Sequence, residues 1–284
     1  MAAQPALQYT VVDVFTDRPL EGNQLGVFTD AHGLSGEQMQ RLAREMNFAE
    51  CTFVLPPERG GHARIRIFTP ARELPFAGHP VLGSAFVVGE RLTDAAVKLE
   101  TGLGPVPVAL TREGGRIVSG RMQQPIPSGA PYERAAELLR ALGVRGSRLP
   151  IEGYKNGPLH VYVELESEGE VAALRPDFAA LAGLAEVGAN CFAGSGKRWK
   201  TRMFAPAHGV NEDAATGSAA GPLALHLARH GRIAFGDEIE IRQGAEIGRP
   251  SLLRARVTGS ADRVETIEVA GSAVIVARGA FELY

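Results

Sequence analysis

Residues 47–54, Asn-Phe-Ala-Glu-Cys-Thr-Phe-Val, place a carboxylate and a thiol side by side in an otherwise apolar segment that is typical of a strand. Adjacent residues of a strand point to opposite faces, so Glu50 and Cys51 should not share one environment. A carboxyl group between Phe48 and Phe53 would be partly desolvated, and desolvation raises the pKa of a carboxyl group. Glu50 is therefore a candidate general base that could also return a proton.

Both side chains also have structural explanations. Glu50 could point outward and pair with an arginine such as Arg64 or Arg66, and spacing alone does not separate the two interpretations. Cys51 should pack on the face opposite Glu50, and Cys191 lies in a small-residue segment that suits a buried strand. Buried thiols are usually inert, so we expect both cysteines to be structural.

Two distant segments of the chain repeat one pattern. Residues 66–85 read RIFTPARELPFAGHPVLGSA, and residues 202–224 read RMFAPAHGVNEDAATGSAAGPLA. Each begins with Arg-x-Phe-x-Pro-Ala, continues through a loop and enters an apolar helix that starts with glycine. Phe68 and Phe204 are 204 − 68 = 136 residues apart, close to half of the chain. A period this long indicates a duplicated unit rather than a solenoid repeat.

The two helix starts carry polar residues at equivalent places, namely His79 in the first copy and Asp213 and Ser218 in the second. Unbonded N–H groups and the helix dipole make a helix N-terminus an anion site, and Gly78 and Gly217 allow a ligand to approach the backbone. This suits a small substrate with a carboxylate. Singly, Asp213 could be a helix cap and His79 a loop tether, but their placement in two copies favours function.

Other motifs give no sign of a metal or a cofactor. His226 and His230 have the i, i+4 spacing of zinc ligands on a helix, but the His-Glu-x-x-His glutamate and an evident third ligand are missing. Residues 194–196 do not complete a dinucleotide fingerprint, and no phosphate-binding loop is present. Ser218 lies outside a G-x-S-x-G elbow, which disfavours it as a nucleophile. We therefore expect no metal and no cofactor.

Several elements are predicted around these residues. A capping box of Ser35 and Gln38 opens an amphipathic helix. The segments after Pro80 and from Gly217 to Leu227 are apolar on nearly all sides, which is typical of buried helices. Strand-like runs with Gly and Pro turns surround both of them.

These elements predict an α+β fold of two similar pseudo-repeat domains, each a curled, mostly antiparallel sheet around a central buried helix. The Pro-rich segment 124–131 is the best linker candidate. We expect domains at residues 1–127 and 128–284, with the last strand packing back on the first domain.

Composition limits the function further. The 284 residues are 45% hydrophobic and 22% charged, with 30 Lys plus Arg against 32 Asp plus Glu. Without a basic stretch, nucleic-acid binding is not expected. Two cysteines argue against a disulfide framework and fit a reducing compartment. No signal peptide and no membrane-spanning run is evident, so a cytoplasmic protein is expected.

Four long segments of the chain resemble one known family. The segments TVVDVFTDRPLEGNQLGVF, EMNFAECTFV, IRIFTPARELPFAGHP and EDAATGSAAGPLALHLARHG are similar to the PhzF family of phenazine biosynthesis. The resemblance extends over the whole chain, and motifs of this length are far more specific than short patterns.

The resemblance implies a diaminopimelate-epimerase-like fold, a homodimer and an active site to which both domains contribute. It also implies a cofactor-free isomerase acting on trans-2,3-dihydro-3-hydroxyanthranilate. In that reaction a proton moves from C3 to C1, and the resulting enol tautomerises to an aminoketone used in phenazine assembly.

The resemblance also implies roles for single residues. Glu50 matches the proton-shuttling glutamate of the family, and His79 and Asp213 match residues around the amino and hydroxyl groups of the substrate. The residues that match the carboxylate-holding helix starts are Gly78, Gly217 and Ser218.

The chain departs from its relatives at two places. Epimerases of this fold use a cysteine at each helix start, whereas this chain has Gly78-His79 and Thr216-Gly217 there, so racemisation by two thiols is not available. Many relatives have serine before the catalytic glutamate, and this chain has Ala49, which removes a possible hydrogen bond. Alternatives are a related isomerase or epimerase of another small amino or hydroxy acid, or a non-catalytic binding protein of a biosynthetic complex.

Overall fold

The computed structural model describes residues 6–282. Two compact units are present: the chain up to Met122 together with the segment from Gly271, and Gln123–Ala270. The expected domain division between residues 127 and 128 stays a prediction, and the residues 1–5 and 283–284 of those domains lie outside the described residues. None of the described helices is long and apolar enough to cross a membrane.

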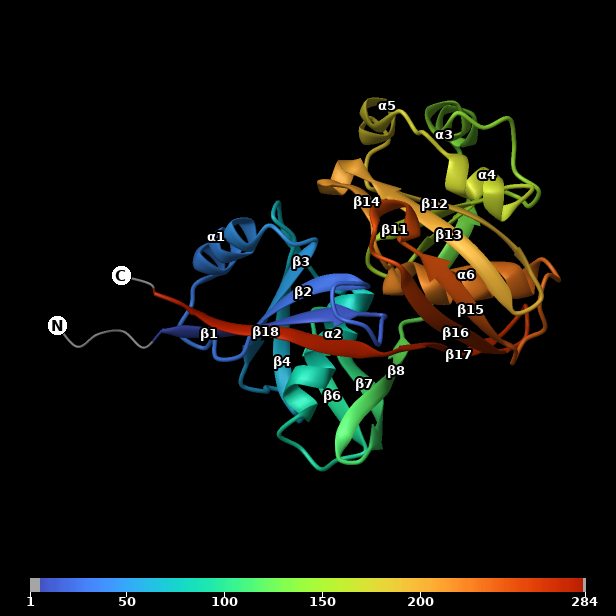
Figure 1. The fold of residues 1–284 in the computed structure, drawn as a ribbon. Helices are drawn as coiled ribbons and strands as arrows, with labels where there is room; N and C mark the ends of the chain where they lie inside the picture. The colour runs from blue at the N-terminus through green and yellow to red at the C-terminus, as the bar shows by residue number, and fades with distance from the viewer. Residues whose placement is uncertain (1–5, 283–284) are drawn as a thin grey trace. The chain divides into compact units, whose positions relative to one another are not determined.

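The first unit is a sheet with two helices (Figure 1). Its strands are β1 (Leu7–Val14), β2 (Asn23–Phe28), β3 (Glu50–Leu55), β4 (Ala63–Phe68), β5 (Glu73–Leu74), β6 (Ala96–Thr101), β7 (Gly104–Glu113), β8 (Arg116–Gln124) and β18 (Ala273–Phe281). Its helices are α1 (Gly36–Met46) and α2 (Gly78–Gly89).

The second unit has a sheet with four helices and two short 3-10 turns. Its strands are β9 (Ser128–Pro131), β10 (Glu152–Lys155), β11 (Leu159–Glu164), β12 (Val187–Ser195), β13 (Arg198–Ala205), β14 (Val210–Asp213), β15 (Glu238–Gln243), β16 (Ser251–Gly259) and β17 (Val264–Gly271). Its helices are α3 (Ala135–Leu142), α4 (Glu168–Ala173), α5 (Phe178–Ala182) and α6 (Gly217–Arg229), and the 3-10 turns are Pro206–His208 and Ala245–Ile247.

The two units repeat one order of strand pairing. In the first, β1–β2 is antiparallel, β2–β3 parallel, β3–β4 antiparallel, β4–β6 parallel, and β6–β7 and β7–β8 antiparallel. In the second, the pairs β10–β11, β11–β12, β12–β13, β13–β15, β15–β16 and β16–β17 have the same directions in the same order. The predicted duplication and the mostly antiparallel sheets are confirmed.

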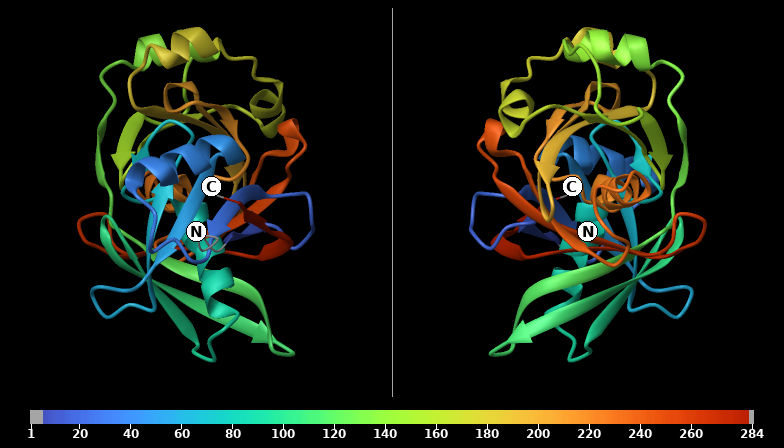
Figure 2. Two further views of the ribbon diagram at one scale, coloured as in Figure 1. Left: turned by 90° about the vertical axis from the view of Figure 1, so that its left-hand side faces the viewer. Right: turned by 90° about the vertical axis from the view of Figure 1, so that its right-hand side faces the viewer.

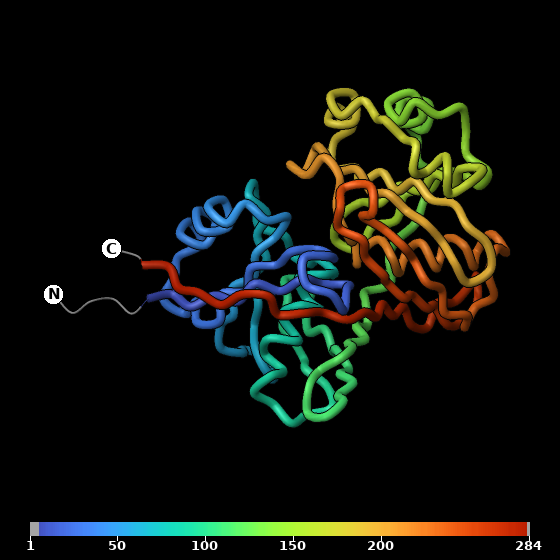
Figure 3. Tube along the Cα trace, viewed as in Figure 1, coloured from blue at the N-terminus to red at the C-terminus, as the bar shows by residue number. Residues whose placement is uncertain are grey.

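The terminal strand of each half is exchanged. β18, from the end of the chain, pairs antiparallel with β1, and its trace can be followed beside β1 in Figure 3. β9, which ends the first half, pairs antiparallel with β10 in the second unit. Residues Ser128–Pro131 of the Pro-rich segment expected to be a linker therefore form a strand, because the backbone of β10 supplies partners for it.

A long helix lies inside the curl of each sheet (Figures 1 and 2). Eleven of the 12 residues of α2 and 12 of the 13 residues of α6 are buried, as their apolar sequences predict. The contact of α2 with the sheet is close at Gly83, where a Cβ atom would lie 2.6 Å from the side chain of Leu25. A larger residue there would push the helix away from the sheet.

The surface helix α1 also follows its sequence. Ser35 and Gln38 form the predicted capping box, and Met39, Leu42 and Ala43 are buried. Local signals of this kind need no distant partner, which is why they could be read from the sequence.

Candidate active site

Glu50 is the first residue of β3, and its side chain lies on the opposite face of the strand from that of Cys51. The side chain of Glu50 is 16% exposed, whereas Cys51 is fully buried in a core cluster with Phe28 and Phe53. The alternation of the strand therefore places the carboxylate and the thiol in different environments, as expected.

The two arginines considered as partners of Glu50 are engaged elsewhere. Arg64 forms an ion pair with Glu58 at 3.0 Å. Arg66 donates two hydrogen bonds to Glu73 at 2.7 and 2.6 Å. Both arginines thus have carboxylate partners other than Glu50.

Glu50 instead lies beside the start of α2. Its Oε2 is 3.5 Å from Nε2 of His79, which is 3% exposed. On the other side of the ring, Nδ1 of His79 is 3.2 Å from the amide nitrogen of Asn23, the first residue of β2. Burial lowers the pKa of His79 to about 3, although a hydrogen bond with the backbone of Gln24 opposes the shift. A carboxylate thus faces a neutral imidazole at neutral pH.

In the second unit, Asp213 ends β14 and lies just before α6. Its Oδ2 accepts a hydrogen bond of 2.6 Å from the hydroxyl of Thr216. That hydroxyl oxygen accepts a hydrogen bond of 2.9 Å from the amide nitrogen of Gln243, which also donates to the carbonyl of Asp213 at 2.8 Å. The chain of donors fixes the carboxylate, whose residue is 8% exposed.

Asp213 does not occupy the N-cap position of α6 that was considered for it. The N-cap residue of α6 is Thr216, and its side chain donates to Asp213. Asp213 is therefore held by the residue that begins the helix and is not itself the N-cap residue.

Ser218 lies in the first turn of α6 and contacts a second buried histidine. Its Oγ is 3.0 Å from Nε2 of His160 on β11. The other ring nitrogen, Nδ1, is 3.4 Å from the amide nitrogen of Asn190, which donates to the carbonyl of Gly188 at 2.8 Å. The carbonyl of Gly188 can only accept, so the side-chain amide of Asn190 faces it with its NH₂ group. The second N–H of that group then donates to Nδ1 of His160, which must be unprotonated, and the ring proton is on Nε2.

This arrangement determines what the serine can do. With Nε2–H of His160 donating to Oγ, the hydroxyl proton of Ser218 remains available for a ligand. Burial, followed by the nearby charge of His208, lowers the pKa of His160 to about 3, so the ring stays neutral at neutral pH. Ser218 is a hydrogen-bond donor held in place, and the donated proton also makes it a poor nucleophile.

The first turn of α6 is supported by side chains because the helix contains Pro222. Proline has no N–H, so the carbonyl of Ser218, four residues earlier, loses its helical partner. The amide nitrogen of Asn156 donates to that carbonyl at 3.0 Å. Gln124 donates to the carbonyl of Gly217 at 2.7 Å, and the hydroxyl of Tyr162 donates to that of Ala219 at 2.7 Å. The helix start is thereby fixed in a single position.

The backbone at both starts can bind an anion. The first N–H groups of a helix have no partner within the helix, and these are at Gly78 and His79 in α2 and at Gly217 and Ser218 in α6. The positive end of the helix dipole adds to the attraction of a carboxylate.

Neither thiol is placed for chemistry. Cys51 and Cys191 are both fully buried, in the hydrophobic cores of the first and second unit. Burial raises the pKa of each thiol to about 12, so both are protonated at neutral pH. The prediction that both cysteines are structural agrees with this environment.

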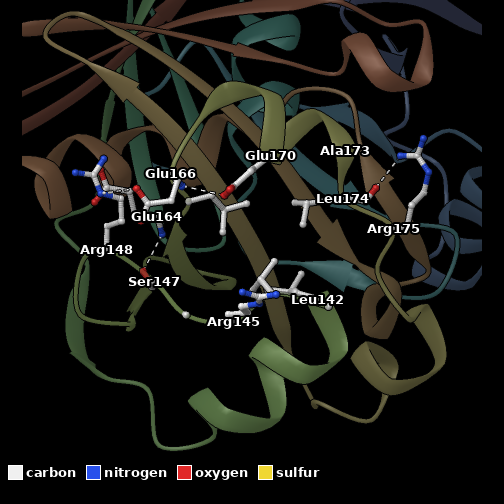
Figure 4. Close-up of a pocket in the computed structure, with 14 residues that line it drawn as sticks. Leu142, Arg145, Ser147, Arg148, Glu164, Glu166, Glu170, Ala173, Leu174 and Arg175 are labelled. Atoms are coloured by element: carbon white, nitrogen blue, oxygen red, sulfur yellow. Dashed lines mark hydrogen bonds and ion pairs between the residues drawn. The ribbon is translucent and has the colours of Figure 1, made fainter.

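A pocket of about 820 Å³ in the second unit lies apart from these groups (Figure 4). Its charged lining consists of Arg145, Arg148, Glu164, Glu166, Glu170 and Arg175, and Leu142 and Leu174 contribute apolar surface. Glu164 is paired with Arg232 at 2.7 Å and Glu166 with Arg148 at 3.5 Å. None of the predicted site residues lines this pocket, so it is not the candidate active site.

The sequence did not identify the residues whose side chains hold the site residues and the start of α6 by hydrogen bonds. These are Asn23, Asn156, His160, Asn190, Thr216 and Gln243. Most of them reach their partners from distant parts of the chain, and no local motif marks them. Pro222 was a usable signal, because a proline inside an apolar helix requires a side-chain donor from elsewhere.

Known proteins resemble this chain over nearly all of its length. The family described as phenazine biosynthesis-like protein (PhzC-PhzF) matches residues 12–279. The trans-2,3-dihydro-3-hydroxyanthranilate isomerase of Pseudomonas aeruginosa is 56% identical over 272 residues, which cover 96% of this chain and 98% of that protein.

Solved structures agree with this relationship. The PhzF-family phenazine biosynthesis protein of Bacillus anthracis superposes with a TM-score of 0.84 at 25% identity, covering 99% of this chain and 100% of that one. A probable proline racemase from Agrobacterium radiobacter has a TM-score of 0.66 at 14% identity, over 96% of this chain and 92% of its own, and shares the fold. The chain therefore belongs to the PhzC-PhzF family and has the α+β fold of the PhzF and racemase proteins.

Proposed function

We propose that this protein is a trans-2,3-dihydro-3-hydroxyanthranilate isomerase that uses Glu50 as its general acid–base. The observation that carries the proposal is the full-length relative of that name at 56% identity. The local geometry is compatible with it, because a partly exposed carboxylate lies 3.5 Å from a buried, neutral imidazole.

Glu50 takes the proton from C3 of the substrate and returns it to C1. The electron pair of the broken C–H bond shifts through the adjacent double bonds, and the enol formed at C3 then tautomerises to the ketone. Substrate and product are isomers, so the step needs no oxidant, reductant or second substrate. One carboxylate that alternates between base and acid is sufficient for this transfer.

The remaining residues hold the substrate. The hydroxyl of Ser218 and the backbone N–H groups at Gly78 and Gly217 bind its carboxylate, as helix starts favour anions. His79 and Asp213 contact its amino and hydroxyl groups. A neutral His79 is suited to this role because it can donate or accept a hydrogen bond without adding charge next to Glu50.

We also infer that the protein acts as a homodimer in the cytoplasm. The dimer follows from the family resemblance, and size-exclusion chromatography with light scattering tests it. Two buried cysteines that stay reduced are compatible with a cytoplasmic location.

A second candidate is isomerisation of a close analogue of that substrate. Ala49 precedes Glu50 where many relatives have serine, so a hydrogen bond to the substrate or to Glu50 is missing there. The Ala49→Ser variant measures this difference. If Ala49→Ser increases turnover of dihydro-hydroxyanthranilate strongly while the natural chain turns it over slowly, an analogue is the better substrate.

The test of the proposal follows the reaction in deuterated water by NMR and mass spectrometry. The pure protein should isomerise dihydro-hydroxyanthranilate, and Glu50→Gln should lower kcat by on the order of 10³ or more while an unreactive substrate analogue still binds. Glu37→Gln, at an exposed position of α1, is the matched control and should leave the rate unchanged.

Two outcomes contradict the proposal. Binding without turnover by the pure protein would favour a non-catalytic partner of a biosynthetic complex. Full turnover by Glu50→Gln would remove Glu50 from the mechanism and leave the reaction to another base.

A further inference from the structure

The last turn of α6 and the start of β10 bring two histidines and a glutamate together, all within the second unit. Glu152 Oε2 is 3.1 Å from Nδ1 of His226 and 3.1 Å from Nε2 of His230. One potential ligand atom from each of the three residues lies within 4.8 Å of the other two. The third ligand that the spacing of the histidines lacked in the sequence is therefore Glu152, which lies 74 residues before His226.

We propose that Glu152, His226 and His230 form a binding site for a divalent transition-metal ion of the zinc type. Two imidazoles and a carboxylate are a donor set that Zn²⁺ prefers, and a water molecule can complete four-coordination. The proposal concerns a site separate from Glu50 and from the two helix starts, and the isomerase proposal makes no use of it.

The spacing of the donor atoms suits a small ion. Ligands at 2.0–2.1 Å from a tetrahedral zinc ion are separated from one another by roughly 3.3–3.4 Å. The two carboxylate-to-imidazole distances of 3.1 Å are slightly shorter, so small side-chain rotations open the required space. His226 in the last turn of α6 and its C-cap residue His230 are four residues apart, a spacing that places side chains on one face of a helix.

The position of the cluster allows an ion to enter. The side chains of Glu152 and His230 are each 22% exposed, whereas that of His226 is fully buried. An ion can thus reach the site past Glu152 and His230 and meet His226 at its inner end.

Aromatic rings fix the inner ligand. His226 stacks on Tyr162 with ring centroids 5.6 Å apart and an interplanar angle of 23°, and Phe192 meets it edge-on at 6.0 Å and 89°. Such surroundings keep the imidazole in one orientation, as supporting groups do in known metal sites. The hydroxyl of Tyr154 donates to Glu152 Oε2 at 2.7 Å and lies 3.4 Å from His226 Nδ1. This hydrogen bond orients the carboxylate.

The competing explanation is a hydrogen-bonded network without an ion. In that network a single oxygen of Glu152 would accept from Tyr154, His226 and His230 at once. The positive charge of Arg229, which lies 5.8 Å above the ring of Tyr154, opposes a cation and favours the network. Metal titration separates the two explanations because only the first predicts saturable binding.

The experiment is isothermal titration calorimetry, in which zinc chloride is added to the chelator-treated, full-length protein near neutral pH. We expect one equivalent of Zn²⁺ per chain with a Kd on the order of micromolar or tighter, and a rise in Tm with zinc. Co²⁺ in place of Zn²⁺ should give visible d–d absorption of a four-coordinate ion. His230→Gln and Glu152→Gln should each weaken binding by at least about 100-fold.

A matched control distinguishes the site from surface binding. His32 contacts Asp30 at an exposed place in the first unit, so His32→Gln removes another histidine beside a carboxylate. This variant should bind zinc as the parent does. If Glu152→Gln does not fold, as judged by its circular dichroism spectrum, His230→Gln at the partly exposed helix end carries the test. Absence of saturable zinc binding, or binding that survives His230→Gln, would overturn the proposal in favour of the network.

Discussion

The two copies of the repeated unit place different side chains at the same positions of their sheets. Phe68 and Phe204 of the shared motif pair with Cys51 and Ala189, so Glu50 corresponds to Gly188 one residue earlier. On the next strand, the parallel partners of these two residues are Leu25 and His160. Where the first copy has the carboxylate and a leucine, the second therefore has a glycine and a histidine.

The exchange has a steric reason. A Cβ atom added to Gly188 would lie 3.0 Å from Nδ1 of His160. The second copy can accommodate its histidine because the position of Glu50 carries no side chain there. Likewise, Leu25 leaves the first copy without a polar group at the position of His160. Each copy thus carries one polar group where the other has a small or apolar residue.

The same holds at the helix starts. His79 and Ser218 occupy equivalent places directly after Gly78 and Gly217. Asp213 pairs with Met203, and Leu74 pairs with Ile67 at the equivalent position of the first copy. The carboxylate of Asp213 therefore has an apolar counterpart, Leu74. In the proposed mechanism, α2 has the proton-handling start, because Glu50 and His79 meet there. The start of α6 is the anion-holding start, because it adds the hydroxyl of Ser218 to the backbone N–H groups that both helices offer.

Among the residues of the two helix starts, His79 at the proton-handling start should show the largest effect. His79→Gln removes the imidazole that faces Glu50 and should lower kcat by on the order of 10³ while KM changes little. Steady-state kinetics on dihydro-hydroxyanthranilate measure both constants. His62→Gln, at an exposed position of the same unit, should leave both unchanged. An increase in KM at constant kcat would instead show that His79 only binds the substrate and does not assist the proton transfer by Glu50.

The groups at these starts were predictable from the sequence, and their supports were not. Gly78, His79, Gly217 and Ser218 follow a motif that repeats within the chain, so their equivalent placement could be read directly. Their functional roles, by contrast, come from the resemblance and stay predictions.

The supports depend on contacts between distant residues. Asn23 lies 56 residues before His79, and His160 lies 58 residues before Ser218. Which polar residues meet depends on which distant strands pair, whereas the alternation of a strand shows only the face on which each residue lies. For the same reason the sequence left Glu50 between a catalytic carboxylate and an arginine partner.

A second comparison concerns stability, because both copies contain the same ion pair at different depths. Arg202 and Glu212 are 6% and 7% exposed, whereas Arg66 and Glu73 are 29% and 43% exposed. Breaking a buried pair leaves an uncompensated charge, so Glu212→Gln should lower the free energy of unfolding by about 3 kcal/mol. Glu73→Gln should cost less than about 1 kcal/mol. Urea denaturation measures both, and equal losses would show that burial does not govern this pair.

A smaller effect is expected at the anion-holding start. Ser218→Ala removes a donor to the substrate carboxylate and should raise KM about tenfold with little change in kcat. His160→Phe should raise KM by a similar or smaller factor, because the serine loses the donor that orients it. His160→Gln, whose amide can still donate to Ser218, should recover part of the loss.

Gly188→Ala tests the same position by crowding the ring of His160. It should give a weaker increase in KM than His160→Phe, because the ring need move by only a few tenths of an ångström. A fall in kcat rather than a rise in KM in these variants would contradict the division between the two helix starts.

The smallest effect near neutral pH concerns the two buried histidines, one in each copy. The pKa of His79 and of His160 is lowered from 6.5 to about 3 by burial. In the unfolded chain both rings take up a proton as the pH falls below about 6.5, whereas the folded protein resists this until about pH 3. Their stabilising contribution is therefore complete above pH 6.5 and is lost progressively between these values.

This linkage predicts how each variant responds to acid. Within that pH range each neutral histidine should contribute a slope of up to about 1.4 kcal/mol per pH unit to the free energy of unfolding. His79→Gln and His160→Gln should each flatten the profile by one such contribution. Denaturant titrations across the range measure the slopes. If both variants reduce the pH slope of the free energy of unfolding equally, the two copies bury their histidines alike although they use them differently. If only one variant reduces the slope, burial also differs between the copies.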